Sequence, residues 1–298
     1  MKTKSTFAVL ALASTMIFGS CAEQAVKPTE VVISEGFRFN ESVCPYDGGI
    51  LVANFGNKGE TYNGQNNDGL GYISMFKDGE LSTFIPSDGY LSAPKGMLVK
   101  DGYLLICDVN KLVAYNLNEL SAAPQVLKFP ESEVVLNDIT SNGNTIYVSV
   151  SSSGKIFTLD GSDLANLASI EPQLWCNIDG ANGVLIHNSV LYGCAFAQTD
   201  VLGPENIVYK ITDLNNPVPE KLIDIPNKWD GVAISEDGKT LYAGCWVPPS
   251  IYALDLETGV ATLLDLDYEL ETPADFALFG GKLYVPDLAA STLLIKDL

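Results

Sequence analysis

Basic residues are scarce in this chain of 298 residues. Arg38 is the only arginine, His187 is the only histidine, and lysine and arginine together number 17 against 37 acidic residues. The formal net charge of −20 at pH 7 repels a phosphate backbone, so we expect no binding to nucleic acid. We predict His187 in a solvated turn between two strands, which disfavours a histidine-based triad and an imidazole-rich zinc site. A phosphate loop of the G-x-x-x-x-G-K type is also missing, so nucleotide binding has no sequence support.

Paired cysteines are a second missing feature. The chain has 6 cysteines, and none of them form the C-x-x-C spacing that holds metals. We predict Cys44, Cys107, Cys176, Cys194 and Cys245 as buried thiols, because small apolar side chains pack well within strands. In an exported protein one disulfide stays open as an alternative, but the spacing does not select a pair.

A long hydrophobic run occurs at the N-terminus, in the segment MKTKSTFAVLALASTMIFGSC. Its two lysines, apolar run and small residues before Cys21 are typical of a secretory signal rather than a membrane span. The ending FGSC resembles a bacterial lipobox, in which Cys21 carries the lipid; an ordinary signal cleaved nearby is the alternative. We therefore predict a signal over residues 1–20, a polar tether over residues 21–30, and an exported lipoprotein. Its lipid alone would hold it to the membrane, on the periplasmic or cell-surface side, and the mature chain would carry 15 basic residues and a net charge of −22.

A strand pair is repeated along the rest of the chain. Each copy opens with a polar residue and an apolar strand, turns at Gly, Asn or Asp, and continues in a second strand with an LY-like pattern. The openers, at steps of 54, 42, 45, 48 and 45 residues, are Glu41, Lys95, Asn137, Asn182, Asp230 and Asp275. A period near 45 that repeats strands is the signature of a propeller blade.

The segments between the copies complete the blades. Most copies are followed by two more strand-like segments, which predicts four strands per blade. The sixth copy ends one strand short after STLLIKDL, whereas EVVISEG near residue 30 is a strand without a blade. We predict an all-β fold, a six-bladed β-propeller over residues 31–298, with the N-terminal strand closing the last blade and hiding its edge. We expect this single closed ring to be a monomer.

Propeller geometry brings the polar openers to one end of the channel. The first strand of each blade lies nearest the axis and the second runs antiparallel, so the second strands add Asn54, Asp108 and Asp287 to the same mouth. So many carboxylates and amides predict a compensating divalent cation, because their oxygens are hard ligands. Calcium is favoured, with magnesium, manganese or zinc as alternatives. For any single copy, the alternative is that Asp or Asn only caps a turn.

Four segments carry a resemblance to a known family. NESVCPYDGG, LNDIT, ANGVLIHNSVLYGC and WDGVAISEDGKTLY are similar to the metal-binding segments of the gluconolactonases and regucalcin, also called senescence marker protein. The resemblance covers nearly the whole mature chain and implies a six-bladed propeller with metal-dependent lactonase activity. It implies Glu41, Asn137, Asn182 and Asp230 as metal ligands, with Asp230 also as the general base.

The chain departs from the family in three places. Lys95 puts a cation into the ring, where it either balances neighbouring charges or contacts the substrate. Cys44 stands where the family carries a proline or another residue, and a long asparagine-rich loop from Gly56 is predicted to cover the channel mouth. The predicted substrate contacts are Lys95, Asn54, Asp108, Asp275 and Asp287.

Two classes of function follow from this site. In the first, the protein is a hydrolase: the metal polarises the carbonyl of a lactone or related small ester, and Asp230 takes a proton from water. In the second, it is a non-catalytic propeller that binds a small ligand or a protein, with a structural cation at the mouth. An open coordination position on the cation favours the first class, and coordination wholly by protein favours the second.

Overall fold

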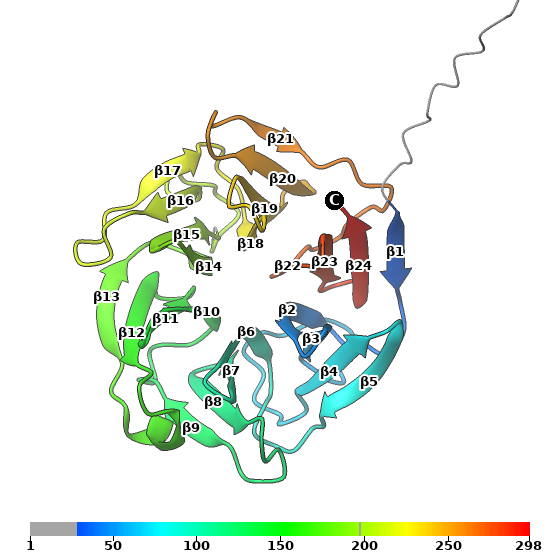
Figure 1. The fold of residues 1–298 in the computed structure, drawn as a ribbon, viewed down its shortest axis with the longest axis vertical. Coiled ribbons are helices and arrows are strands. Elements are labelled where there is room, and N and C mark those ends of the chain that lie inside the picture. Colours follow the sequence, from blue (N-terminus) through cyan, green and yellow to red (C-terminus); the bar gives the residue numbers. More distant parts are fainter. Residues whose placement is uncertain (1–28, 197) are drawn as a thin grey trace, which may run out of the picture.

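The computed structural model describes residues 29–196 and 198–298. These residues form six four-stranded antiparallel sheets around a central axis (Figure 1), which confirms the predicted six-bladed β-propeller. The predicted signal, Cys21 and most of the predicted tether lie outside the described residues. Within the described ranges, no helix is long and apolar enough to cross a membrane.

Five blades each use four consecutive strands, numbered from the axis outward. Blades 1 and 2 comprise β2 (Asn40–Tyr46), β3 (Gly49–Asn54), β4 (Tyr72–Lys77), β5 (Glu80–Ile85), β6 (Pro94–Lys100), β7 (Tyr103–Asp108), β8 (Lys111–Asn116) and β9 (Gln125–Lys128). Blades 3 to 5 comprise β10 (Leu136–Asn142), β11 (Thr145–Val150), β12 (Lys155–Asp160), β13 (Gln173–Asn177), β14 (Ala181–His187), β15 (Val190–Ala195), β16 (Val208–Ile211), β17 (Glu220–Ile223), β18 (Trp229–Ile234), β19 (Thr240–Trp246), β20 (Pro249–Asp255) and β21 (Ala261–Leu263).

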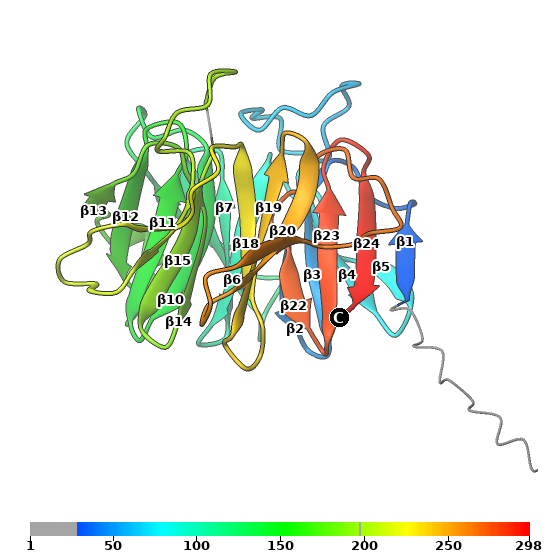
Figure 2. The same cartoon turned by 90° about the horizontal axis from the view of Figure 1, so that it is seen from above.

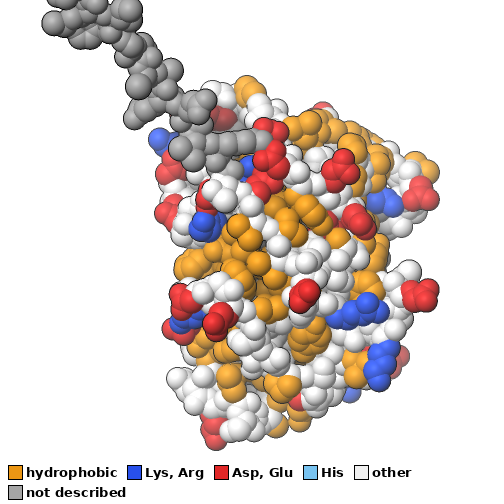
Figure 3. Space-filling model, turned by 90° about the vertical axis from the view of Figure 1, so that its right-hand side faces the viewer, with side chains coloured by type: hydrophobic (Ala, Val, Ile, Leu, Met, Phe, Trp, Pro, Cys, Tyr) orange, Lys and Arg blue, Asp and Glu red, His pale blue; other side chains and the backbone are white. Residues whose placement is uncertain are grey.

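The two ends of the chain share the sixth blade. Its strands are β22 (Ala277–Phe279), β23 (Lys282–Asp287), β24 (Thr292–Asp297) and β1 (Glu30–Ile33), with β1 on the outer edge. β1 runs antiparallel to β24, with Glu30 opposite Lys296, as the sequence predicted. Strand β1 begins one residue before the predicted domain boundary. Figure 3 shows this side of the ring, where apolar side chains are interspersed with acidic and basic ones.

Short turns fix the register of the strand pairs. The turn between β2 and β3 consists of Asp47 and Gly48, with φ of 47° and 74°, and Asp101 and Gly102 join β6 to β7 with φ of 47° and 79°. Two positive φ values in a two-residue loop are the type I′ geometry, whose twist matches that of paired strands. The Asp-Gly pairs in the sequence therefore set which residues of each strand face the next blade.

The hydrophobic core lies between neighbouring blades. Leu105 of β7, for example, packs in one cluster with Val148 of β11, and both are fully buried. The 3-10 helix η1 (Leu164–Ser169), which the sequence did not predict, adds Leu167 to this cluster. The five cysteines of the described chain are free thiols; four of them are buried, as predicted, whereas Cys176 is only partly buried, so the prediction is wrong for that residue.

Candidate functional site at the channel mouth

A β-bulge positions the polar opener in five of the six blades. In blade 1, the pairing of β2 with β3 shifts register between Asn40 and Ser42, which leaves Glu41 outside the regular ladder. Equivalent shifts occur in the first strands of blades 2 to 5, at their own openers. A bulge leaves a residue unpaired and redirects its side chain. These openers can therefore leave the pleat of the sheet and point toward the channel axis.

Glycine follows the opener in three blades because the inner strands approach closely there. A Cβ on Gly183 would lie 2.4 Å from the backbone oxygen of Asp230, and one on Gly231 would lie 2.7 Å from that of Ala274. Both distances are too short for a real carbon atom. The NG and DG pairs of the sequence thus allow neighbouring blades to meet around a narrow channel.

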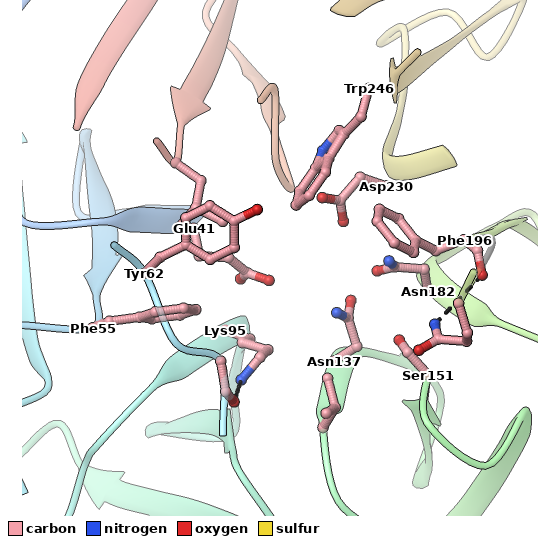
Figure 4. A pocket seen from close by; sticks show the side chains of 14 residues that line it. Glu41, Phe55, Tyr62, Lys95, Asn137, Ser151, Asn182, Phe196, Asp230 and Trp246 are labelled. Atoms are coloured by element: carbon pink, nitrogen blue, oxygen red, sulfur yellow. Dashed lines mark hydrogen bonds between the residues drawn. The ribbon is translucent and has the colours of Figure 1, made fainter. Parts of the chain in front are cut away.

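Five of the six openers line one cavity at the channel mouth. The cavity has a volume of about 140 Å³, and the openers that line it are Glu41, Lys95, Asn137, Asn182 and Asp230. In Figure 4 the carboxylates of Glu41 and Asp230 and the amides of Asn137 and Asn182 point toward the same central region. The tertiary structure therefore brings the four predicted metal ligands together.

These four side chains also carry unsatisfied oxygens. Glu41 Oε2, Asn137 Oδ1, Asn182 Oδ1 and Asp230 Oδ1 are buried and have no hydrogen-bond partner. Each residue is at most 5% exposed. Leaving a buried acceptor unpaired costs on the order of 1–3 kcal/mol, so four such oxygens around one cavity favour an electrophilic partner there. Oxygens of carboxylates and amides are the donor set that a hard divalent cation prefers, so the residues present fit such an ion.

Two of the four proposed ligands are amides rather than carboxylates. Among residues 29–196 and 198–298, no group of three or more His, Cys, Asp and Glu side chains is arranged to hold a metal. The cavity instead combines two carboxylates with the amide oxygens of Asn137 and Asn182. The donor set is therefore apparent only when the unpaired amide oxygens are counted with the carboxylates.

Lys95 provides a positive charge beside the four polar side chains, Glu41, Asn137, Asn182 and Asp230, which we call the cavity floor. Its side chain is 2% exposed, and Nζ donates hydrogen bonds to the backbone oxygens of Gly64 and Ala93, each at 2.9 Å. Nζ also lies 5.1 Å from the centre of the Phe55 ring. An ammonium group has three donors, so one proton remains for the cavity side. Lys95 thus partly balances the negative floor and ties the loop that contains Gly64 to it.

Burial shifts the pKa values of the titratable side chains around the cavity. Burial raises the pKa of Asp230 to about 7, and the nearby carboxylate of Asp138 adds to this rise. Burial also raises the pKa of Glu41, with Asp230 adding to the rise and Lys95 opposing it. The pKa of Lys95 is lowered by burial, against the attraction of Glu41. The buried negative charge therefore favours the binding of either protons or a cation.

Two further carboxylates lie outside the cavity lining. Asp275, predicted as an opener and substrate contact, accepts a hydrogen bond from Ser42 Oγ at 2.9 Å. Asp138 accepts from the backbone N–H of Val184 at 2.6 Å, and burial raises its pKa to about 7. The sequence analysis missed Asp138. A usable signal was its place directly after the opener Asn137, where three other blades have glycine.

The three polar residues predicted from the second strands also lie outside the cavity lining. Asp108 accepts backbone N–H groups from residues 92–93, Asp287 accepts them from residues 271–272, and Asn54 Oδ1 accepts one as well. All three side chains are fully buried. Their hydrogen bonds hold the mouth loops in place, so the structure places them as supports of the site and gives them no surface toward a ligand.

Aromatic rings that the sequence analysis did not select form the walls of the cavity. Phe55, Tyr62, Phe196 and Trp246 line it and are shown in Figure 4. The Trp246 ring packs edge-on against Phe196 and Tyr62, with centroid distances of 4.8 and 6.1 Å. Tyr62 belongs to the loop between β3 and β4, which rises above the blades at the mouth, as does the loop after β15 (Figure 2). The predicted covering loop is thus at the predicted end of the channel.

The comparisons with solved structures show the same fold at low sequence identity. A catalytically inactive virginiamycin B lyase from Staphylococcus aureus, solved with quinupristin, is 13% identical, with 91% of this chain and 99% of that chain covered and a TM-score of 0.61. A streptogramin B lyase is 12% identical over 91% and 97% of the two chains, also with a TM-score of 0.61. A chain of a nidogen–laminin complex is 13% identical over 83% and 84%, with a TM-score of 0.57.

These similarities establish the fold of the protein, but they do not identify a family to which it belongs. A scan against protein-family models found no match, and a search of curated proteins found none either. The chain is a six-bladed β-propeller with an anionic, aromatic-walled cavity at one mouth. The resemblance to the gluconolactonases and regucalcin stays a prediction.

Proposed function

We propose that this protein is a divalent-cation-dependent hydrolase of a lactone or related small ester. The observation that carries the proposal is the set of four buried, unpaired oxygens that four different blades present to one cavity. Glu41, Asn137, Asn182 and Asp230 would hold the cation, with calcium favoured and magnesium, manganese or zinc as alternatives. When bound, such an ion polarises a carbonyl oxygen and lowers the pKa of water beside it.

The residues of the chain have definite tasks in this reaction. Asp230, as the proposed general base, accepts a proton from the attacking water. The water oxygen bonds to the carbonyl carbon, the bond from that carbon to the ring oxygen breaks, and Asp230 returns the proton to the departing oxygen. A lactone thus opens to a single hydroxy acid, which holds all atoms of the lactone and of the water, and Asp230 returns to its starting state. The aromatic walls exclude bulk water from the cavity and orient the ring.

A second candidate is a non-catalytic binding propeller with a structural cation at the mouth. The feature that favours it is the exposed apolar side chains on the mouth loops, among them Val201, which is 79% exposed. Proteins with the same fold were solved with a small molecule, quinupristin, and in a complex with laminin. Cation binding without turnover of any lactone or ester would favour this candidate.

Asp230→Asn tests the proposed site. Asn keeps the shape and caps a turn about as well as Asp but removes one negative charge. We expect calcium affinity to fall at least about tenfold, since one unit charge of the donor set is lost, and lactone hydrolysis to fall much further. Both are measured after chelation, by calorimetric titration of calcium and manganese and with a panel of lactones. Asp237→Asn is the matched control, because Asp237 lies in an exposed turn of the same blade.

The outcomes separate the alternatives. Equal calcium affinity in the Asp230→Asn variant and the unchanged protein means that Asp230 only caps its turn, and the metal site is then refuted. Loss of binding in the Asp237→Asn control would point to a non-specific effect of net charge.

A further inference from the structure

Several polar groups in the cavity walls are already used within the protein. Lys95 Nζ donates to two backbone oxygens, and Ser151 Oγ and Trp246 Nε1 donate to one each at 2.9 Å. Gln198 Nε2 is directed to the backbone oxygen of its neighbour Phe196, at 3.4 Å. Apart from the four unpaired oxygens of the floor and the third proton of Lys95 Nζ, these wall groups offer few hydrogen bonds to a ligand. A substrate with several hydroxyl groups would leave most of them unsatisfied on entering, which costs affinity.

The walls instead offer apolar surface. Phe55, Tyr62, Phe196 and Trp246 surround the floor, and Leu288 adds an aliphatic side chain. The cavity volume of about 140 Å³ is close to the roughly 150 Å³ that accommodates a benzene ring in other proteins. A single small ring with one polar ester group therefore matches the cavity: its ester faces the floor, and its hydrocarbon part contacts the rings.

Exposed apolar side chains, which we call the apolar lip, lie next along the chain to two of these walls. We use this name for Val201, Leu202 and Val247, which are 79%, 36% and 49% exposed. The first two belong to the loop that begins with Phe196, and Val247 directly follows Trp246, so the lip adjoins two wall residues along the chain.

Hydrogen bonds hold the two parts of the lip together. Lys228 pairs with Asp200 at 3.1 Å on one side, and its backbone oxygen accepts the N–H of Trp246 on the other. Asn227 donates from Nδ2 to the backbone oxygen of Val247 at 2.7 Å and receives the N–H of Val247 on Oδ1. The exposed side chains of the lip are thus supported by a connected backbone at the cavity entrance.

We propose that the substrate is a lactone or ester with a neutral alkyl or aryl substituent, whose tail lies on the apolar lip. The inference rests on the proposed function of the same cavity and names its substrate class. A polyhydroxylated sugar lactone fits less well, because the walls leave its hydroxyl groups without partners. A tail that ends in a carboxylate is also disfavoured, because the chain has a net charge of −20.

A chain-length series tests this inference. The probes are γ-lactones that share one ring and carry straight alkyl substituents from methyl to hexyl, with δ-gluconolactone as the polar comparison. Each methylene buried on the lip should strengthen binding about fourfold until the lip is covered. If the lactones are hydrolysed, kcat/KM gives this dependence; if they are not, calorimetric binding of the intact lactones gives it. Failure of the proposed hydrolysis and failure of the substrate assignment are therefore distinguished.

Variants locate the tail. Val201→Asp and Val247→Asp place a carboxylate on the lip, and we expect the gain per methylene to fall from about fourfold to less than about twofold. Val218→Asp is the matched control, since Val218 is 59% exposed but follows β16 at the opposite face of the same blade as Val201. Independence of chain length, or preference for δ-gluconolactone, overturns the substrate class. An unchanged gain in both lip variants, or an equal loss in the control, overturns the assignment of the lip.

Discussion

At the residue scale, the site concentrates negative charge where water is excluded. Glu41, Asp138, Asp230 and Asp275 are each at most 8% exposed, and Lys95 is the buried cation beside them. Burial is the main cause of the raised pKa of all four carboxyl groups. The folded protein therefore gains free energy when these groups bind protons or a cation, and the two should compete.

This competition predicts an unusual dependence of stability on pH. The Asp230 carboxyl keeps its proton up to a pKa of about 7 in the folded state, whereas an unfolded aspartate releases it at about 4. Between these values the folded state binds more protons, so the free energy of unfolding should fall as pH rises from about 4 to about 7, by ~2–4 kcal/mol.

Urea denaturation from about pH 5 to about pH 8, with chelator or with calcium, measures this fall. Calcium should reverse most of it at the higher pH, because the ion binds the deprotonated carboxylates. Asp230→Asn cannot release this proton, so its fall with pH in chelator should be smaller. The same pH dependence with calcium and with chelator would contradict a cation at these carboxylates.

At the element scale, the loop between β3 and β4 is held by cations rather than by a core of its own. Arg38 Nε donates to the backbone oxygen of Asn57 at 3.1 Å, and Lys95 Nζ donates to the backbone oxygen of Gly64 at 2.9 Å. Tyr62 lies between these two anchors and forms one wall of the cavity. The position of the wall therefore depends on both anchors.

Lys95→Met should release this loop. Methionine fills a similar space but cannot donate to the loop backbone, and hydrogen bonds from charged groups contribute about 1.5–3 kcal/mol. We expect tryptic cleavage after Lys58, which is exposed on the same loop, to accelerate about tenfold or more.

The control is Lys77→Met, which removes the pair with Asp47 at the end of a different hairpin. Urea denaturation of each variant shows whether global unfolding explains the cleavage. If Lys58 is cut no faster in Lys95→Met than in Lys77→Met, then Lys95 does not position the loop.

At the scale of the whole molecule, the ring is closed by four residues of β1. The pair between Lys296 Nζ and Glu30 Oε1, at 2.7 Å, joins the two ends of the chain, with side chains 6% and 8% exposed. Strand β1 ascends from Glu30 toward the mouth loops, so the described chain starts on the face opposite the candidate site.

Breaking the closing pair should weaken the whole ring. Lys296→Met removes the cation from the buried Glu30 carboxylate and leaves it, among the described residues, only the backbone N–H of Asp267, and breaking such a pair costs about 3–5 kcal/mol. The double variant Glu30→Leu with Lys296→Met should recover much of this loss, because no buried charge remains.

Chemical denaturation measures the three proteins, and Lys282→Met serves as the control because its pair with Asp297 is far more exposed, at 43% and 37%. Exposed pairs contribute only about 0–1 kcal/mol. A loss in Lys296→Met no larger than in the control would show that this pair does not stabilise the closure.

The sequence by itself determined the architecture and the ring of openers. A strand pair repeated at a period near 45 residues fixes the number of blades, and a spare strand at one end and a missing one at the other fix the closure. Because inner strands all start at one mouth, the repeat also placed Glu41, Asn137, Asn182 and Asp230 together. These features depend on local strand patterns and on the symmetry of the fold, which a single sequence displays.

Only the tertiary structure decided which polar residues face the cavity and what surrounds them. Asp108 and Asp287 end second strands at the same mouth as the openers, but their carboxylates turn to the backbone N–H groups of neighbouring loops. Tyr62 and Phe196 come from loops without a repeat, so no period marks them. The direction of such a side chain depends on contacts between segments far apart in the chain. These contacts determine the conformation of each loop, whereas each strand forms because apolar and polar residues alternate within its own sequence.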